Sequence, residues 1–365
     1  MKKLTALGAF VALVAYLVAW PVEVDPVAWQ APEDKGYVDG FQQNQQLSQI
    51  QRIELKDQIG PEDYALSPDG NVYFGLLSGD IAYLDQAGQV QTWVNTQGRP
   101  LGIEFDGQGN LIVADAFLGL LKVDPQGKIE TLVTEIDGIA LNYADDVDVA
   151  DNGKIYFSDA STKFHAKQYG TFAASMLDIN EHGGHGRVLE YDPTTKQTTT
   201  LADGFNFANG VAISHDQQWL LLNETGTYQV LKVGIAESNK GQVETLIDNL
   251  PGFPDNISRG SNGVYWVGLV SPRSQALDAL SGSAFLRKIV QRLPAFMRPK
   301  AKHFGHIIAI NDQGKVVHNL QDPLGMYGHT TGALEVGSDL YVSSLHDTAL
   351  GKTKNVNASP LAVNQ

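Results

Sequence analysis

The stretch SPDGNVYFGLLSGDIAYLDQAGQVQTWV, residues 67–94, alternates short apolar runs with tight turns. It reads as strand, Asp-Gly turn, strand, Gly-Asp turn, strand, Ala-Gly turn and strand. Such turns suit tight hairpins because Gly and Asn tolerate positive φ. The stretch therefore predicts one antiparallel sheet of hairpin-connected strands.

The same pattern returns along the chain, which predicts a repeat architecture. One apolar residue anchors a strand in each unit: Tyr73, Ile112, Tyr156, Leu221, Trp266 and Tyr341. These anchors are 39, 44, 65, 45 and 75 residues apart, from their numbers. The short spacings match the roughly 40–50 residues of a four-stranded propeller blade, and the long ones contain insertions. We predict an all-β fold, a six-bladed β-propeller with a central channel. A β-sandwich, the alternative, gives no reason for six repeats.

The repeat also predicts the domain boundaries. The propeller is expected over residues 51–348, with QRIELKD at 51–57 completing the last blade and closing the ring. Residues 23–50 are polar and lack clear periodicity, which predicts a linker or stalk. Residues 349–365 are expected to form a C-terminal tail. The insertions fall at about 160–186 and 271–303.

The N-terminus resembles a membrane anchor. Lys2 and Lys3 precede an uncharged run over residues 4–22, and a helix of that length spans roughly 28 Å of bilayer. Bulky Trp20 stands where a cleaved signal peptide carries small residues, so residues 1–22 favour an uncleaved signal anchor, a transmembrane helix. The lysines place the N-terminus in the cytoplasm. We therefore expect a single-pass protein of a bacterial-type inner membrane, with the propeller on the periplasmic or extracytoplasmic side.

Composition and motifs exclude several function classes. The net charge of −15 argues against a nucleic-acid partner, because binding phosphates requires clustered Lys and Arg. With no cysteine, the chain has no thiolate nucleophile, disulfide or Cys-based metal site. No GxSxG elbow, P-loop or dinucleotide fingerprint occurs, so serine-hydrolase and nucleotide readings lack support.

The second insertion has its own charge pattern. No acidic residue lies between Asp278 and Asp312, and residues 284–302 are basic and carry apolar side chains at helical spacing. Two interpretations stay open: a basic amphipathic helix that contacts anionic lipid, and a lid helix on the propeller face with a solvated basic side.

Oxygen-bearing side chains recur eleven or twelve residues before the strand anchors. The residues at this offset are Glu62, Leu101, Asp145, Asn209, Asp255 and Thr330. Four of these six are strong oxygen donors, and equivalent positions of propeller blades meet at the channel. Calcium binds carboxylate and amide oxygens, so Glu62, Asp145, Asn209 and Asp255 are predicted calcium ligands. His182 and His185 lie in a glycine-rich loop, which we favour over a zinc site there.

Several motifs together resemble the strictosidine synthase-like family, including its adipocyte plasma membrane-associated branch. They are, in chain order, GPEDYALSPDG, GRPLGI, ADAFLGLLKVD, DDVDVADNGKIYFSDAS, GRVLEYDPTTKQ, FANGVAIS and LPGFPDNI. The resemblance covers roughly residues 50–348. It implies a six-bladed propeller that holds calcium or a similar divalent cation, and it implies lactone or ester hydrolysis in many members. Paraoxonases and gluconolactonases share this fold more distantly.

The resemblance carries over to single positions. It adds Asn256 to the metal ligands. It also matches His329 to a family histidine near the channel mouth. Two interpretations of His329 stay open: it binds substrate or shuttles protons, or it is an ordinary polar loop residue. Asp145 stands where relatives usually carry Asn. Leu101 replaces a histidine proposed as general base in paraoxonases, and Thr331 replaces the catalytic glutamate of strictosidine synthase.

Two functions follow as hypotheses. The first is a calcium-dependent hydrolase of lactones or aryl esters, in which Asp255 or Asp145 accepts the proton of the attacking water and His329 assists. Its partners would be a small-molecule ester or lactone and the membrane, reached through the N-terminal helix and the insertion 284–302. The second is a non-enzymatic binding module with a structural calcium ion.

Overall fold

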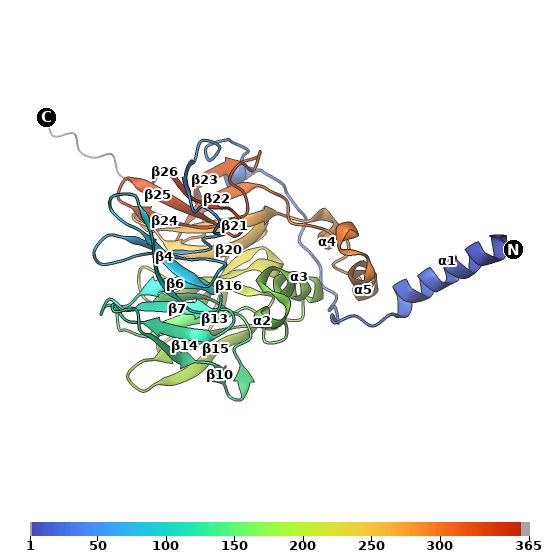
Figure 1. The fold of residues 1–365 in the computed structure, drawn as a ribbon, viewed down its shortest axis with the longest axis horizontal. Helices are drawn as coiled ribbons and strands as arrows, with labels where there is room; N and C mark the ends of the chain where they lie inside the picture. Colours follow the sequence, from blue (N-terminus) through green and yellow to red (C-terminus); the bar gives the residue numbers. More distant parts are fainter. Residues whose placement is uncertain (1, 359–365) are drawn as a thin grey trace.

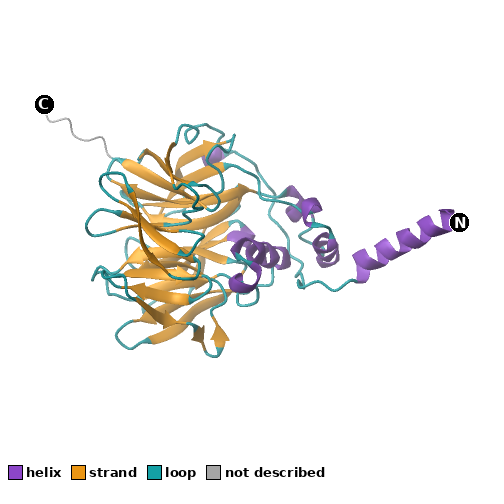
Figure 2. Ribbon diagram, viewed as in Figure 1, coloured by secondary structure: helices purple, strands orange, loops and turns teal. Residues whose placement is uncertain are grey.

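The computed structural model describes residues 2–358 and forms a six-bladed β-propeller, which confirms the predicted fold (Figures 1 and 2). Each blade is a four-stranded antiparallel sheet whose strands follow one another in the chain, except in the last blade. The sequence forms this architecture because each hairpin turn joins apolar strands that need a second sheet to cover them.

The first three blades lie in chain order. Blade 1 contains β2 (Tyr64–Leu66), β3 (Val72–Gly75), β4 (Asp80–Leu84) and β5 (Val90–Asn95). Blade 2 contains β6 (Pro100–Phe105), β7 (Leu111–Asp115), β8 (Gly119–Val123) and β9 (Ile129–Val133). A small hairpin, β10 (Glu135–Ile136) and β11 (Ile139–Ala140), precedes blade 3. Blade 3 contains β12 (Ala144–Val149), β13 (Ile155–Asp159), β14 (Gly186–Asp192) and β15 (Gln197–Phe205).

The last three blades complete the ring. Blade 4 contains β16 (Ala208–Ile213), β17 (Trp219–Glu224), β18 (Gln229–Gly234) and β19 (Val243–Ile247), with the turn η2 (Thr225–Thr227). Blade 5 contains β20 (Gly252–Arg259), β21 (Val264–Pro272), β22 (Gly305–Asn311) and β23 (Val316–Asp322). Blade 6 contains β24 (Thr330–Val336), β25 (Asp339–Ser344), β26 (Ala349–Lys354) and β1 (Gln51–Glu54).

Blade 6 closes the ring by joining both ends of the repeat region. β1 pairs with β26 in antiparallel register, from Gln51 with Lys352 to Glu54 with Ala349. The predicted closing strand is thus present, over residues 51–54 of the expected 51–57. The pairing also corrects the predicted boundary at 348, because the segment expected to open a tail is a strand of the sheet, and the propeller reaches Lys354.

The apolar core lies between neighbouring blades. Ile112 of β7 and Phe157 of β13 belong to one buried cluster that joins blades 2 and 3. Equivalent clusters join each of the other neighbouring pairs of blades. The ring is thus held together by blade-to-blade burial, and each blade depends on both neighbours.

Both predicted insertions fold into helices at one end of the propeller. They connect the second strand of a blade to the third, in blade 3 and blade 5. The first contains α2 (Ala166–Tyr169) and α3 (Thr171–Glu181), and the second contains α4 (Gln275–Ala279), α5 (Ala284–Arg292) and η3 (Ala295–Met297). Figure 1 places these helices on the side from which α1 (Lys2–Ala19) projects. We call this end the lid face.

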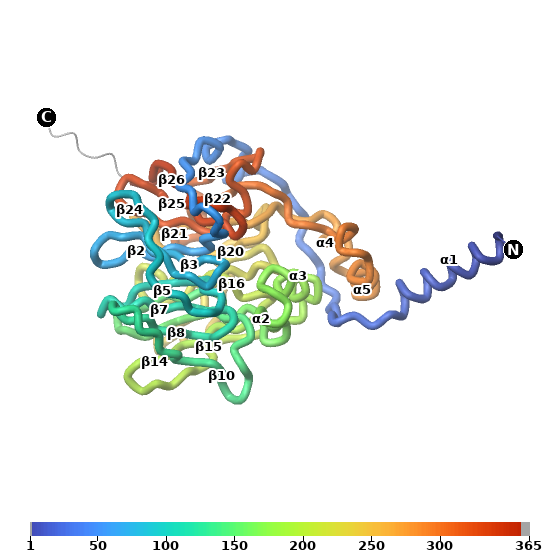
Figure 3. The backbone as a smooth tube through the Cα atoms, viewed as in Figure 1, coloured from blue at the N-terminus to red at the C-terminus, as the bar shows by residue number. Residues whose placement is uncertain are grey.

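The segment 23–50, predicted as a linker or stalk, lies against the lid face. Figure 3 traces it from α1 past the lid helices to blade 5. The backbone N–H of Val27 donates to the Glu181 carbonyl oxygen, and that of Trp29 donates to Ser281. Leu47 is fully buried in the core of blades 5 and 6. The short turn η1 (Asp39–Phe41) lies in this segment.

The β1–β26 closure generates a stability prediction. Leu350 is fully buried, whereas Val356, just beyond the sheet, is exposed. Leu350→Ala should lower the free energy of unfolding by about 2–5 kcal/mol, and the control Val356→Ala should change it by no more than about 0.5 kcal/mol. Denaturant unfolding measures both. Equal effects would mean that residues 349–354 do not belong to the ring.

Candidate metal and ester site in the channel

A shared β-bulge positions the channel residues. In five blades the pairing of the innermost strand with its neighbour shifts at the same point, as between Ala144 and Val147. A bulge turns a side chain away from the regular alternation of a strand. The residues carried by the bulges at equivalent positions are Leu101, Asp145, Asn209, Asp255 and Thr331, and Glu62 takes the corresponding place in blade 1.

This register corrects one predicted position. Leu334 pairs with the anchor Tyr341, as Asp148 pairs with the anchor Tyr156. Counting back three residues from each gives Thr331 and Asp145, so Thr331, and not Thr330, is the sixth channel residue. Thr330 instead donates its Oγ1 hydrogen to the His306 carbonyl oxygen at 3.0 Å.

The five predicted metal ligands share one property. Each ends in a buried oxygen for which no hydrogen-bond donor lies within reach among the described residues: Glu62 Oε2, Asp145 Oδ2, Asn209 Oδ1, Asp255 Oδ1 and Asn256 Oδ1. A buried polar atom without a partner costs about 1–3 kcal/mol, and most such atoms in proteins are satisfied. Four of these oxygens are at equivalent places in four blades and the fifth is on the next residue, which indicates a site that binds a group other than protein.

Backbone contacts fix the blades around these oxygens. Asn256 donates from Nδ2 to the Glu62 carbonyl oxygen at 3.1 Å, and Thr331 donates from Oγ1 to the same oxygen at 2.5 Å. Asn223 donates from Nδ2 to the Asp255 carbonyl oxygen at 2.7 Å. Blades 4, 5, 6 and 1 are thereby held together next to the channel residues.

The residue after each channel position alternates around the ring. Blades 1, 3 and 5 carry Asp63, Asp146 and Asn256 there, and blades 2, 4 and 6 carry Gly102, Gly210 and Gly332. A Cβ on Gly102 would lie 2.2 Å from Asp146 Oδ1, and one on Gly210 would lie 2.5 Å from the Cα of Asn256. Glycine is therefore required where the neighbouring blade approaches.

The acids at these positions bind backbone amides of the following blade. Asp63 accepts from the Ile103 N–H at 3.1 Å, and Asp146 accepts from the Val211 N–H at 2.7 Å. One carboxylate oxygen of Asp146 is thus hydrogen-bonded to blade 4, whereas Oδ2 of its neighbour Asp145 has no hydrogen-bond partner among the described residues.

The channel concentrates negative charge away from water. Burial raises the pKa of Glu62 and of Asp145 well above the usual range, and the charge of Asp255 raises both further, as that of Glu62 does for Asp145. Burial also raises the pKa of Asp255 to about 7. Like charges held together in a poorly solvated site favour proton uptake or cation binding. The described residues contain no group of three or more His, Asp or Glu side chains placed to hold a metal by themselves, so an ion here would need the amide oxygens of Asn209 and Asn256 as well.

Arg99 supplies a buried positive charge beside these acids. Its side chain is 1 % exposed, its Nε has no partner among the described residues, and no described carboxylate forms an ion pair with it. Burial lowers the pKa of Arg99, whereas Glu62, Asp115 and Asp145 act to raise it. The guanidinium therefore offsets part of the channel's negative charge without direct contact.

Three histidines gather at the lid-face end of the channel. The His329 ring lies 4.8 Å from that of His303 and 5.4 Å from that of His346, between centroids. Burial lowers the pKa of His329 to about 4, so its ring is neutral at pH 7. Its Nδ1 lies 3.3 Å from the Val270 carbonyl oxygen. Because a carbonyl only accepts, Nδ1 carries the proton and Nε2 is left as the acceptor.

Sequence reasoning missed Arg99, His303 and His346. Arg99 stands in GRPLGI, a quoted motif, but next to Leu101, the position that was compared with relatives. The other two histidines occur in segments without any repeat signal, KHFGH and SLHDT. Only the fold brings them to His329.

His182 and His185 are structural, in line with the preferred interpretation. The His182 ring stacks on Trp29 at 4.0 Å, and His185 Nε2 lies 2.7 Å from Glu181 Oε1. Lys163 binds the same carboxylate at 2.6 Å. These contacts attach the segment after α1 to the first insertion.

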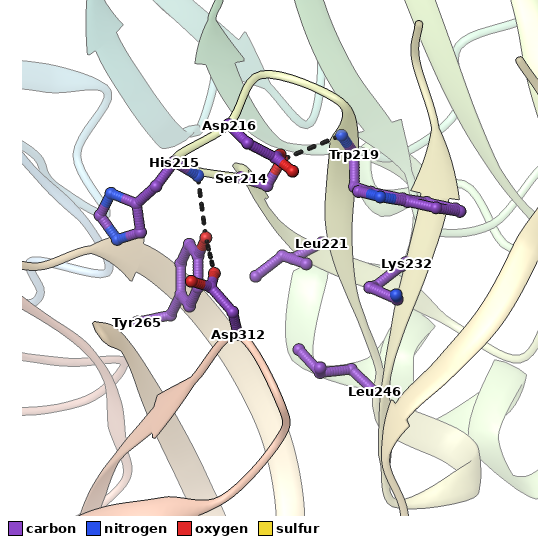
Figure 4. Close-up of a pocket in the computed structure, with 9 residues that line it drawn as sticks. All are labelled: Ser214, His215, Asp216, Trp219, Leu221, Lys232, Leu246, Tyr265 and Asp312. Carbon is purple, nitrogen blue, oxygen red and sulfur yellow. Dashed lines mark hydrogen bonds between the residues drawn. The ribbon is translucent and has the colours of Figure 1, made fainter. Parts of the chain in front are cut away.

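A pocket of about 400 Å³ lies at the opposite end of blades 4 and 5 (Figure 4). Ser214, His215 and Asp216 line it, but they form no catalytic triad. Ser214 Oγ donates to Asp216 Oδ1 at 2.5 Å, and the His215 ring nitrogen Nε2 faces the Val264 carbonyl oxygen at 3.2 Å. The pocket is on the turn after β16, whereas Asn209 is at the start of β16, so the two sites are at different ends.

Comparison with family models places two parts of the chain. The strictosidine synthase model matches residues 145–238, and the model for the N-terminal part of strictosidine synthase-like proteins matches residues 39–83. Among curated proteins, strictosidine synthase-like protein 4 of Arabidopsis thaliana is 37 % identical, over 78 % of this chain and 76 % of the relative. The adipocyte plasma membrane-associated protein of Danio rerio is 31 % identical, over 96 % of this chain and 89 % of the relative.

Solved structures share the fold at low identity. A gluconolactonase from Xanthomonas campestris has a TM-score of 0.61 and 16 % identity, covering 84 % of this chain and 90 % of its own. Regucalcin from Agrobacterium tumefaciens, a calcium-binding protein, has a TM-score of 0.58 and 14 % identity, covering 82 % and 92 %. Both likenesses concern the propeller architecture.

The buried carboxylate of Asp145 generates a prediction. Asp145→Asn removes one of the like charges that burial makes costly, so the variant should melt at a higher temperature than the natural protein in excess chelator. It should also gain less from calcium, which adds about 2.7 kcal/mol at a hundredfold excess over Kd. Thermal unfolding with and without calcium measures both. Asp151→Asn, in an exposed turn, should change neither. A lower melting temperature in chelator with an undiminished calcium gain would contradict this account.

Proposed function

This chain belongs to the family of strictosidine synthase-like proteins, and on that premise we propose that it is a calcium-dependent hydrolase of lactones or aryl esters. The observation that carries the proposal is the set of five buried oxygens without partners on Glu62, Asp145, Asn209, Asp255 and Asn256. The lactone substrate and the calcium ion are suggested by the descriptions of the gluconolactonase and regucalcin neighbours.

The donor set fits calcium. Three carboxylates and two amides offer only oxygen, and calcium takes six to eight oxygens, some of them from water. Softer metals favour nitrogen or sulfur ligands, whereas the unpartnered atom of each of these five side chains is an oxygen. When bound, the ion would polarise the ester carbonyl and stabilise the developing negative charge.

The chain's own groups would complete the reaction. Water adds to the acyl carbon, its proton passes to Asp255 or Asp145, and the acyl C–O bond then breaks. The leaving oxygen takes up a proton, giving a hydroxy acid from a lactone or an acid and an alcohol from an ester. His329, whose ring is neutral with Nε2 as the acceptor, would bind the substrate or relay that proton.

Two substitutions support the alternative, a binding module with a structural ion. Leu101 is 1 % exposed within an apolar cluster, and Thr331 is bound to the Glu62 carbonyl oxygen and to Ser343 Oγ. Neither side chain supplies a general acid or base. The same contacts disfavour a condensing reaction, since Thr331 serves to hold the blades.

The N-terminal helix would place the enzyme at a membrane. By length and composition α1 could cross a bilayer, a profile that a signal sequence shares. We infer that it anchors a single-pass protein of an inner membrane, with Lys2 and Lys3 on the cytoplasmic side and the propeller on the extracytoplasmic side.

Hydrolysis of lactones and phenyl acetate tests the proposal. Excess chelator should abolish turnover by the full-length protein, and calcium should restore it. Asp255→Asn should lower kcat/KM by at least about a hundredfold, because it removes both a charged ligand and a base. His215→Ala, in the pocket of Figure 4, should leave kcat/KM unchanged. Turnover that persists in chelator would exclude the metal mechanism. No turnover on any substrate, together with a large thermal shift on calcium addition, would favour the binding module.

A further inference from the structure

The helix α5 has its two arginines inside and two large apolar side chains, Phe285 and Leu286, outside. Arg287 and Arg292 are 1 % and 7 % exposed, whereas Phe285 and Leu286 are 51 % and 42 % exposed. The turn η3 continues this surface with Phe296 and Met297, 77 % and 55 % exposed. A lid helix bathed in water would have the opposite arrangement. We call these four side chains the apolar rim: Phe285, Leu286, Phe296 and Met297.

The buried arginines fasten α5 to the N-terminal part of the chain. Arg292 donates from Nε to the Trp20 carbonyl oxygen at 2.6 Å and from Nη1 to that of Leu17 at 2.9 Å. Tyr16 Oη returns a bond to the Arg292 carbonyl oxygen at 3.0 Å. The last carbonyl groups of a helix lack partners and carry partial negative charge, so a guanidinium satisfies them well. α5 is therefore attached to the C-terminal end of α1.

The attachment of α5 to the end of α1 determines the depth of the apolar rim relative to the bilayer. α1 has no buried residue and spans about 27 Å, so in a bilayer its end lies at the lipid–water border. Tyr16 and Trp20, with ring centroids 5.7 Å apart, occupy that end, where membrane proteins place such residues. Figure 1 shows α5 beside the base of α1 at the lid face. The rim lies at the same border.

The charges around the rim match a lipid surface. Lys288, Lys300 and Lys302 lie near it in a region that has no acidic residue between Asp278 and Asp312, although the chain carries a net charge of −15. Lys288 forms a salt bridge with Asp25 at 2.6 Å. Among the described residues, Lys300 and Lys302 form no ion pair. Apolar side chains bordered by cations are typical of helices that lie in an anionic membrane surface.

We propose that α5 and η3 insert the apolar rim into the bilayer crossed by α1 and so hold the channel mouth against the lipid. This goes beyond the lipid contact expected from basic residues alone, because the arginines act as internal fasteners and the apolar side chains make the contact. If the proposed hydrolase activity holds, on which this second step rests, the substrates are lipophilic esters or lactones that reach the channel from the membrane.

Labels attached to the full-length protein in vesicles test the docking. The chain contains no cysteine, so Phe296→Cys and Leu286→Cys each give one site for an environment-sensitive fluorophore. Val243→Cys, an exposed position on β19 at the outside of blade 4, is the matched control. In vesicles of phosphatidylcholine and phosphatidylglycerol, labels at 296 and 286 should emit at shorter wavelength and be quenched by spin-labelled lipid, and the label at 243 should not.

The outcomes separate the possible occupants. Labels at 296 and 286 as water-exposed as that at 243 would overturn the proposal. A spectral shift without lipid quenching, growing with protein density in the vesicles, would assign the rim to a second copy and also overturn it.

An activity measurement tests the second step separately. The double variant Phe296→Asp and Met297→Asp should lose about tenfold in kcat/KM on an ester dissolved in vesicles, and should keep its rate on a short water-soluble ester. If the double variant keeps the kcat/KM of the natural protein on both substrates, membrane delivery is contradicted. Absence of all turnover, with the labels still quenched, would remove the hydrolase and leave the docking standing.

Discussion

The structure depends on a cluster of buried oxygens that repel one another. Glu62, Asp145 and Asp255 approach the channel from three blades, with amide oxygens of Asn209 and Asn256 beside them. Their burial raises the pKa of each acid, and Arg99 offsets the charge only in part. In the proposed function, a cation among these groups would offset their charge. This constraint links the fold, which creates the cluster, to the chemistry proposed for it.

The ring has local devices that make such a cluster possible. A bulge in the innermost strand of five blades turns the channel residue inward, and glycine in alternate blades lets the next blade approach closely. Asp63 and Asp146 use their oxygens on backbone amides instead. Adjacent acids in one motif, Asp145 and Asp146, thus have different tasks. The first faces the channel and the second joins two blades.

Much of this was readable in the sequence because the signal repeats. Hairpin turns and anchor spacing predicted the six blades, and one offset predicted the oxygen donors. The offset failed at Thr330 because the hairpin that joins β24 to β25 is one residue shorter than the one that joins β12 to β13, which the pattern does not reveal. The strand β26 was missed because ALGKTK has a weak apolar pattern, and one of its two strand partners, β1, lies almost three hundred residues away in the chain. The polarity of α5 was hidden for a related reason: Arg287 and Arg292 are buried only because distant carbonyl oxygens bind them.

The lid face gives the site its surroundings. The segment after α1 and the two helical insertions gather on the side from which α1 projects (Figure 1). The rings of His303, His329 and His346 pack together, and His346 contacts Phe172 of α3. The proposed hydrolase function assumes an ion among the channel oxygens. Calorimetric titration of calcium into the chelator-treated full-length protein tests that claim most directly. The account predicts one calcium ion per chain, with binding lost in Asn209→Ala. Absence of binding, or binding that Asn209→Ala leaves unchanged, would contradict it.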